Sequence, residues 1–236
     1  MATPLSGRLA LVTGASRGIG AATAEALGKA GAHVILTART AGGLEEVEER
    51  IHAVGGTATI APLDLAENDS IARLAEAIGG RWAALDILVL NAAMLGTLAP
   101  VPAIDPKEFA RLLTLNIMAQ QQVIAAFDPL LRASTAGRLL GVTSSVGARP
   151  RPYWGAYGAS KAALDNLLLV YGEEVANISN VRVAIVDPAA TATRMRAQAF
   201  PGEDQATLKG PDVVGAAILK LVADDFVNGH RIRVEA

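Results

Sequence analysis

Short apolar runs and longer amphipathic segments alternate along the 236-residue chain. The runs have the length and the Val, Ile and Leu content of buried strands, and the segments repeat apolar residues at helical spacing. The predicted strands span residues 8–13, 33–38, 57–64, 85–93, 137–145, 181–188 and 230–235. The predicted helices span residues 20–31, 43–55, 70–80, 106–132, 157–176 and 210–224.

This alternation indicates βαβ units. Strands that are apolar along their whole length are typical of a parallel sheet with helices on both faces. No Pro-, Gly- or Ser-rich linker and no internal repeat divides the chain. We therefore predict an α/β fold, a doubly wound parallel seven-stranded sheet with helices on both faces, Rossmann-like, as a single domain over residues 1–236.

Composition narrows the function classes. The chain has 21 basic and 23 acidic residues and a net charge of -2, so nothing favours nucleic acid or an anionic membrane as partner. It has no Cys and only three widely spaced His, so we expect no metal site. No apolar run approaches the roughly 20 residues of a membrane span, and the start lacks the apolar core of a signal peptide. We expect a cytoplasmic protein without a membrane partner.

A glycine-rich turn, TGASRGIG at 13–20, joins the first predicted strand to the first predicted helix. Its glycines Gly14, Gly18 and Gly20 would let a ligand approach the backbone. The helix N-terminus offers free N–H groups that suit a pyrophosphate. The alternative is a tight turn that needs positive φ. The G-x-x-x-G-x-G spacing differs from the commoner G-x-G-x-x-G, and no G-K-[ST] of a P-loop follows.

The end of the second strand bears on the choice of dinucleotide. A free ribose 2′-OH usually meets an acidic residue there, but this chain has Ala38 and then Arg39. Arg17 in the glycine turn can approach the same region. Two guanidinium groups suit a 2′-phosphate, so we predict NADP(H) in preference to NAD(H). The alternative is that Arg39 is a solvated charge at the start of a helix.

A Tyr and a Lys four residues apart, Tyr157 and Lys161, share one face of the predicted helix 157–176. A phenol with a pKa near 10 exchanges protons poorly at neutral pH, but a neighbouring ammonium group lowers that pKa. The pair could therefore act as a general acid and base. Taken singly, the Tyr could be a core residue and the Lys a surface charge.

With TGASRGIG at 13–20 and YGASK at 157–161, which matches Y-x-x-x-K, the chain resembles the short-chain dehydrogenase/reductase family in its single-domain form, over essentially its whole length. The resemblance implies an NADP-dependent oxidoreductase that transfers a hydride between NADP(H) and a small carbonyl or secondary alcohol substrate, a carbonyl reductase or alcohol dehydrogenase. The catalytic residues it implies are Asn116, Ser144, Tyr157 and Lys161. The cofactor-binding residues predicted from the motifs are Gly14, Ser16, Arg17, Gly18, Ile19, Gly20, Arg39, Asp64, Leu65, Asn91, Ala92, Tyr157, Lys161, Pro188, Thr191 and Thr193.

The resemblance also implies a role for each catalytic residue. Tyr157 exchanges the proton, and Ser144 hydrogen-bonds the same substrate oxygen. Lys161 also binds the nicotinamide ribose, and Asn116 helps to hold a water that links this Lys to solvent. Family spacing favours Ser144 over Ser145, because Tyr157 follows it by thirteen residues and S-x-x-G is completed by Gly147.

Three positions depart from the family pattern. The family carries N-N-A-G where this chain has Leu90-Asn91-Ala92-Ala93, so the first Asn and the Gly are replaced. The family's P-G-x-x-x-T is here Pro188 to Thr193, with Ala189 in place of Gly. An alanine restricts the backbone there if the loop requires positive φ.

The resemblance implies that the catalytic and substrate loop, about 189–210, includes a mobile lid. This stretch after Thr193 is polar and has no clear period. Six apolar or aromatic residues line a substrate pocket or serve ordinary packing. They come from the end of the fourth predicted strand, the segment before the Tyr-Lys pair and this loop: Met94, Leu95, Tyr153, Trp154, Met195 and Phe200. Arg149 and Arg151 bind an acidic substrate group, face solvent or contact a neighbouring subunit.

The family resemblance further implies a homodimer or homotetramer built on the long helices 106–132 and 157–176. Two other functions stay open at this stage. One is a non-catalytic NADP(H)-binding or regulatory protein. The other is a nucleotide-sugar epimerase or dehydratase, although such chains are typically longer and carry G-x-x-G-x-x-G.

Overall fold

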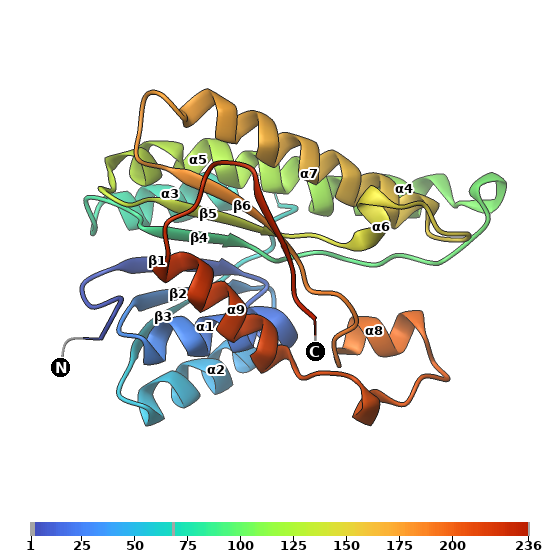
Figure 1. Ribbon diagram of the computed structural model, residues 1–236, viewed down its shortest axis with the longest axis horizontal. Helices are drawn as coiled ribbons and strands as arrows, with labels where there is room; N and C mark the ends of the chain where they lie inside the picture. The colour runs from blue at the N-terminus through green and yellow to red at the C-terminus, as the bar shows by residue number, and fades with distance from the viewer. Residues whose placement is uncertain (1–2, 68, 236) are drawn as a thin grey trace.

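The computed structural model describes residues 3–67 and 69–235, and its strands form one parallel sheet (Figure 1). The strand order is β3-β2-β1-β4-β5-β6-β7. The strands are β1 Leu9–Thr13, β2 His33–Ala38, β3 Thr57–Pro62, β4 Ile87–Leu90, β5 Arg138–Val142, β6 Arg182–Asp187 and β7 His230–Arg233. Each lies within the range predicted for it, and the predicted doubly wound parallel seven-stranded sheet is confirmed.

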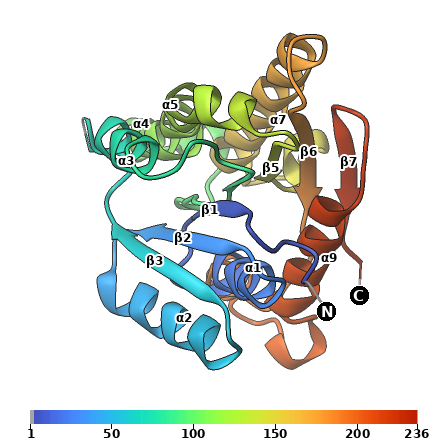
Figure 2. The same cartoon turned by 90° about the vertical axis from the view of Figure 1, so that its left-hand side faces the viewer.

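Helices cover both faces of this sheet, as Figure 2 shows along the strands. On one face lie α1 Gly18–Lys29, α2 Ala41–Ala53 and α9 Pro211–Ala223. On the other face lie α3 Ser70–Gly79, α5 Ala119–Ala133 and α7 Gly155–Val175. Two buried apolar clusters, one on each side, explain why the strands are apolar along their whole length. Among the described residues, no helix combines the length and apolarity that crossing a membrane requires.

The strand order reverses at β1, which pairs with β2 on one side and with β4 on the other. In doubly wound sheets such a reversal opens a crevice beyond the carboxyl ends of the two central strands. Here those ends are Thr13 and Leu90. The segments that leave them, the turn 14–17 and the stretch 91–95, therefore place the predicted cofactor residues Gly14, Ser16, Arg17, Asn91 and Ala92 at this edge of the sheet.

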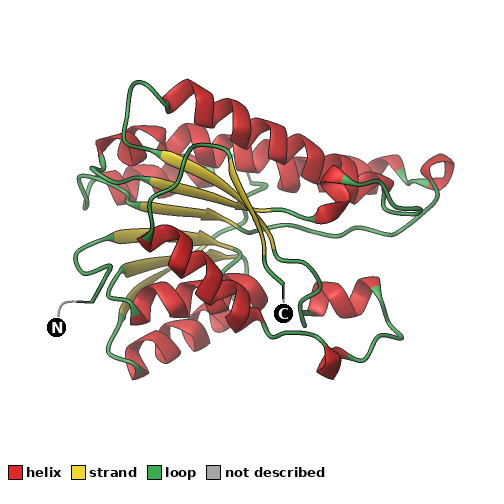
Figure 3. Ribbon diagram, viewed as in Figure 1, coloured by secondary structure: helices red, strands yellow, loops and turns green. Residues whose placement is uncertain are grey.

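The structure differs from the sequence expectation in several helical segments (Figure 3). The predicted helix 106–132 is α4 Pro106–Leu113 and α5, joined by a π-helical turn, Thr114–Met118. A short helix α6, Ser145–Ala148, follows β5. The stretch without clear period contains α8, Arg194–Ala199, and a 3-10 turn, Gln205–Thr207; another 3-10 turn spans Val101–Ala103. A six-residue helix is too short to show a period in the sequence.

Candidate functional site

The glycine turn between β1 and α1 is built so closely that larger residues would not fit. A β-carbon at Gly14 would lie 2.9 Å from Ala92 Cα, and one at Gly20 would lie 2.3 Å from Gly14 O. Gly14 and Gly18 also have positive φ values of 65° and 57°. At these three positions glycine is therefore required, because of space at Gly14 and Gly20 and of positive φ at Gly14 and Gly18.

Thr13 and Asn91 tie this turn to the end of β4. The Thr13 hydroxyl accepts from the amide N–H groups of Asn91 and Ala92, at 2.9 and 3.0 Å. The Asn91 side chain donates in return to Thr13 O at 2.9 Å and to Gly14 O at 3.2 Å. Gln120 on α5 donates to Ala92 O at 3.0 Å. Sequence reasoning selected Asn91 and Ala92 but missed Thr13 and Gln120, because a Thr or Gln inside an apolar segment carries no signal of its own.

The N-terminus of α1 opens onto this turn with its amide groups free. Among the residues that the structure describes, no side chain caps α1 and no acidic residue stands in its first turn. Arg17, the residue before the helix, is exposed, as is Arg39 just beyond β2. Within the described chain neither arginine forms an ion pair. A bare turn, a free helix N-terminus and two unpaired guanidinium groups fit a dinucleotide that carries phosphate groups.

The remaining predicted cofactor residues surround the same edge of the sheet. Ser16 packs against α2, where a β-carbon at Gly43 would lie 3.0 Å from Ser16 Cβ. Ile19 packs on the apolar cluster beneath α1. After β3, Asp64 accepts from the Ala66 N–H at 2.9 Å, and Leu65 is buried on the other face.

The Tyr–Lys pair lies on α7 as predicted, and both side chains are buried. Tyr157 is 7% exposed and Lys161 is 3% exposed. The Lys161 Nζ lies 5.6 Å from the centre of the Tyr157 ring and donates to Val142 O of β5 at 3.0 Å. The Tyr157 hydroxyl donates to the sulfur of Met195 on α8 at 3.9 Å. One helical turn thus holds both groups at the carboxyl end of β5, beneath α8.

Burial shifts the pKa values of these two groups in opposite directions. Burial raises the pKa of Tyr157, and the negative charge of Asp187 adds to that rise. Burial lowers the pKa of Lys161 to about 8, and the charge of Asp165 opposes part of this change. The expected lowering of the Tyr157 pKa is not seen in this structure, because burial, followed by the charge of Asp187, produces a net rise. Tyr157 therefore keeps its proton at neutral pH.

Ser144 caps α6. Two glycines, which lack side chains, allow this short helix to pack closely against α7. A β-carbon at Gly147 would lie 2.9 Å from Ala162 N, and one at Gly158 would lie 2.9 Å from Val146 O. The S-x-x-G pattern thus has a packing reason, since it brings the Ser144 turn onto the helix that carries Tyr157. The Ser144 hydroxyl accepts a long 3.5 Å contact from Val146 N–H, whereas Ser145 is the first residue of α6.

Asn116 lies in the π-helical turn between α4 and α5 and is fully buried. Its side-chain oxygen accepts from Met94 N–H at 2.9 Å. Its side-chain nitrogen donates to Met94 O at 2.9 Å and to the Ser160 hydroxyl at 3.1 Å. Asn116 therefore joins the segment after β4 to α7, next to Lys161. Such π turns recur at functional sites, and here the turn directs one side chain inward.

The loop from Pro188 to Thr193 leaves β6 and reaches the glycine turn. Thr191 donates to Pro188 O at 2.8 Å, and Thr193 caps α8 by accepting from Arg196 N–H at 3.1 Å. A β-carbon at Gly18 would lie 3.6 Å from Thr193 Cγ2. Ala189 has a φ of 50°, so this loop does require positive φ where the family carries Gly.

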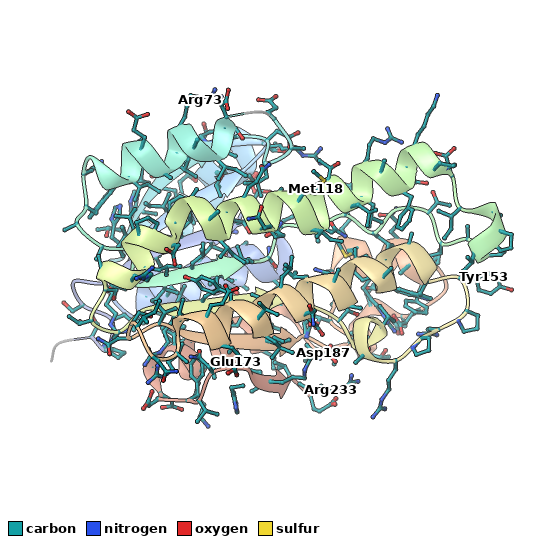
Figure 4. All side chains as sticks on the ribbon, turned by 90° about the horizontal axis from the view of Figure 1, so that it is seen from above. Arg73, Met118, Tyr153, Glu173, Asp187 and Arg233 are labelled. Atoms are coloured by element: carbon teal, nitrogen blue, oxygen red, sulfur yellow. The ribbon has the colours of Figure 1, made fainter. Side chains whose placement is uncertain are left out.

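Several predicted pocket residues gather beside Tyr157. The Trp154 ring lies edge-on to the Tyr157 ring at 5.9 Å and tilted against Phe200 at 5.7 Å. With Met195, these rings bring α8 over the Tyr157 hydroxyl. Leu95 is buried, whereas Tyr153 is 60% exposed and projects outward in Figure 4. The Tyr153 side chain is therefore turned away from this group of residues.

Arginines attach the segment around α8 to the loop before α7. Arg151 lies over the Phe200 ring at 4.9 Å, and Arg196 lies over the same ring at 3.8 Å. Arg196 also forms a two-pronged ion pair with Glu203. Arg151 thus holds an aromatic side chain, while Arg149 faces solvent. Across residues 3–67 and 69–235, no group of three His, Cys, Asp or Glu side chains is arranged to hold a metal.

Comparisons with known proteins agree with this geometry. The family model described as short chain dehydrogenase matches residues 8–204. An uncharacterized oxidoreductase of Escherichia coli K12, YciK, is 36% identical over 94% of this chain and 88% of its own. A solved short chain dehydrogenase from Salmonella enterica serovar Typhi is 34% identical, covers 100% of this chain and 99% of its own, and superposes with a TM-score of 0.95. A protein of Escherichia coli CFT073, whose crystal structure is a complex with NADPH, is 34% identical, covers 100% of both chains and has a TM-score of 0.94.

Because Lys161 is buried, we predict that the free energy of unfolding depends on pH. In the folded protein the pKa of Lys161 is about 8. Below this pH, Lys161 is charged in both the folded and the unfolded chain, and the full cost of burying the charge reduces stability. Above that pKa the folded protein releases the proton first, so stability rises until the unfolded chain also loses its proton near 10.5. From about pH 7 to about pH 9, wild type should gain about 1 kcal/mol of unfolding free energy relative to Lys161→Met.

Urea unfolding at both pH values measures this difference. Lys107→Met, at an exposed position on α4, is the matched control. A difference between wild type and Lys161→Met that does not change with pH would contradict the buried, destabilised charge.

Proposed function

Because the chain belongs to the short chain dehydrogenase family of oxidoreductases, we propose that it transfers a hydride between NADP(H) and a small carbonyl or secondary alcohol substrate. The observation that carries this proposal is the buried Tyr157–Lys161 pair at the carboxyl end of the sheet. It lies at the same edge as the bare glycine turn, so a proton-exchanging group and a phosphate-binding turn share one site.

In this proposal Tyr157 acts as the general acid for carbonyl reduction. The cofactor, when bound, supplies the hydride. Tyr157 keeps its proton at neutral pH because burial and Asp187 raise its pKa. A protonated phenol can donate to the carbonyl oxygen as that oxygen gains negative charge. The protonated phenol is the form that donates a proton in carbonyl reduction, and it is the form present at neutral pH.

The neighbouring residues orient the substrate and supply charge. The Ser144 hydroxyl makes only a long contact within the described protein, so its hydrogen is free to bind the substrate oxygen. Lys161 places a positive charge beside the phenol ring and favours the phenolate that remains after proton donation. Asn116 fixes the segment at Met94 against α7. The role of Asn116 in holding a water next to Lys161 stays a prediction.

For the cofactor we propose the residues predicted from the motifs. The turn around Gly14, Gly18 and Gly20 would receive the pyrophosphate, and Asp64 would receive the adenine. The loop 188–193 would lie near the nicotinamide. Arg17 and Arg39, which form no ion pair within the described chain, would bind a 2′-phosphate and give NADP(H) its preference over NAD(H). The solved relative in complex with NADPH supports this choice.

We further propose a homo-oligomer that uses the outer face of α5 and α7. A groove of about 450 Å³ runs between these helices. Apolar side chains such as Ile124, Val170 and Ile178 line it, together with the charged side chains of Asp128, Arg132 and Glu174. Val170 is 46% exposed and Ile178 is 61% exposed, and Met118 and Glu173 lie on the same side of the molecule in Figure 4. An apolar face of this kind is typical of subunit interfaces. A cytoplasmic location stays a prediction.

The first test compares the two tyrosines of the segment 153–161. Tyr157→Phe removes only the hydroxyl and should lower the rate of NADPH-dependent carbonyl reduction by about a hundredfold or more, while NADPH still binds. Tyr153→Phe is the matched control and should leave the rate unchanged, because Tyr153 is exposed and lies outside the pocket.

Steady-state assays over a panel of aldehydes, ketones and alcohols measure this effect. Full activity of Tyr157→Phe would refute the assigned acid. NADPH binding by wild type without turnover of any compound would instead support the non-catalytic binding protein.

The second test concerns the 2′-phosphate. Arg39→Ala should weaken NADPH binding about tenfold to a hundredfold, because a charged bidentate contact is lost, and should leave NADH binding nearly unchanged. Fluorescence titration gives both Kd values. Arg73→Ala, at an exposed arginine on α3 far from the turn, is the control. Equal losses for NADPH and NADH, or tighter binding of NADH by wild type, would overturn the preference.

The third test concerns the oligomer. Val170→Asp places a charge in the apolar groove and should shift the assembly to monomers in sedimentation at micromolar concentrations. Val54→Asp, at an exposed apolar residue beside α2, should leave the assembly intact. A wild-type chain that sediments as a monomer under these conditions would refute the interface.

A further inference from the structure

Ala189 holds a backbone conformation that costs energy for any residue except glycine. Its φ is 50°, in the left-handed region. Among the described residues, the other non-glycine residues with positive φ are Asp69 and Tyr153, both of which are exposed. Ala189 is partly buried in the loop that leaves β6 toward α8. Some local interaction must therefore hold this peptide in place.

Asp187, the last residue of β6, supplies such an interaction. Its Oδ1 accepts from the Ala189 N–H at 2.9 Å, the contact of an Asx turn. Its Oδ2 accepts from Arg233 Nη1 on β7 at 2.8 Å. The Asp187 side chain is 9% exposed and Arg233 is half exposed, and Figure 4 shows the two side by side. Arg233 thus fixes the carboxylate that binds the amide of Ala189.

Two other side chains in and near this loop bind its carbonyl groups. Thr191 donates to Pro188 O at 2.8 Å, and Lys209 Nζ donates to Ala190 O at 2.8 Å. Among the described residues, only Asp187 binds the amide of Ala189 itself. The peptide between Pro188 and Ala189 is therefore held at its N–H by Asp187 and at its C=O by Thr191.

We propose that Asp187, held by Arg233, is a positioning residue that keeps Ala189 in the left-handed conformation and so gives the loop 188–193 its shape. The pair does here what a glycine would do without assistance. Glycine adopts positive φ at no steric cost, whereas alanine is disfavoured there by roughly tenfold in population. An Asx hydrogen bond to the strained residue offsets that preference.

The shape of this loop matters to the site because its far end touches the glycine turn. Thr193 lies against Gly18, and Thr193 also starts α8, which carries Met195 over the Tyr157 hydroxyl. If Ala189 turned to negative φ, the chain would leave β6 in another direction and Thr193 would move. That consequence for the cofactor rests on the proposed function, whereas the coupling between Asp187 and Ala189 does not.

A double-mutant cycle tests the coupling. The proteins are wild type, Asp187→Ala, Ala189→Gly and the variant with both changes. Asp187→Ala should raise the Kd for NADPH about tenfold when residue 189 is Ala, but at most two- to threefold when it is Gly. Thermal unfolding without cofactor should show the same pattern, with a loss of a few degrees that Ala189→Gly largely restores.

Two further variants separate the hydrogen bond from the charge. Asp187→Asn keeps an oxygen that can accept from Ala189 N–H, so its Kd should stay near that of wild type. Arg233→Gln removes the ion pairs of Arg233 with Asp187 and Glu235 but leaves the hydrogen bond from Ala189 N–H to Asp187, so it should have a smaller effect than Asp187→Ala. Circular dichroism checks that each variant is folded. If Asp187→Ala does not fold, Asp187→Asn is used in its place.

Equal losses from Asp187→Ala in both backgrounds would overturn the proposal, as would an Asp187→Asn variant as impaired as Asp187→Ala. A wild-type chain that binds no NADPH would refute the proposed function instead. The unfolding cycle without cofactor would in that case still decide whether Asp187 holds Ala189.

Discussion

The candidate site depends on one set of hydrogen bonds, those that join Thr13 at the end of β1 to Asn91 after β4. The Thr13 hydroxyl accepts two amide N–H groups, and the Asn91 side chain donates back to Thr13 O and Gly14 O. These bonds hold the two central strands together where their ladder ends, at the reversal of the strand order. Because Gly14 then lies against Ala92, position 14 has no room for a side chain, and the backbone of the turn is accessible to a ligand.

A second constraint is the burial of two polar side chains on α7. Placing a phenol and an amine in an apolar interior costs solvation, which the fold limits by giving Lys161 a carbonyl partner on β5. The same desolvation raises the pKa of Tyr157 and lowers that of Lys161. The helix is fixed by glycine contacts with α6 and by buried apolar residues such as Leu164 and Leu168. The stable packing around α7 therefore maintains a pair that is unfavourable in itself.

The sheet and its helices could be predicted from the sequence because each strand is apolar along its length, a pattern that depends only on local residues. A candidate catalytic set could be predicted from motif spacing, and the structure places two of its members, Tyr157 and Lys161, on one helical turn. The direction of the Tyr157 pKa shift could not be predicted, since it depends on how much protein surrounds the hydroxyl. The contacts of Thr13, Asp187 and Asn116 could not be predicted either. Thr13 binds amide groups far away in the sequence, Asp187 binds an alanine with an unusual φ, and Asn116 lies in a π turn that has no sequence signature.

The three departures from the family pattern show that a substitution must be judged against the backbone at its own position. Leu90 belongs to the buried apolar cluster beside α5, an environment that suits a leucine side chain. Ala93 replaces a Gly at a place where this chain has no positive φ, so alanine carries no torsional cost. Ala189 replaces a Gly where φ is positive, and only there does a carboxylate, with an arginine behind it, bind the amide of the substituted residue. The compensation thus appears where backbone geometry requires it.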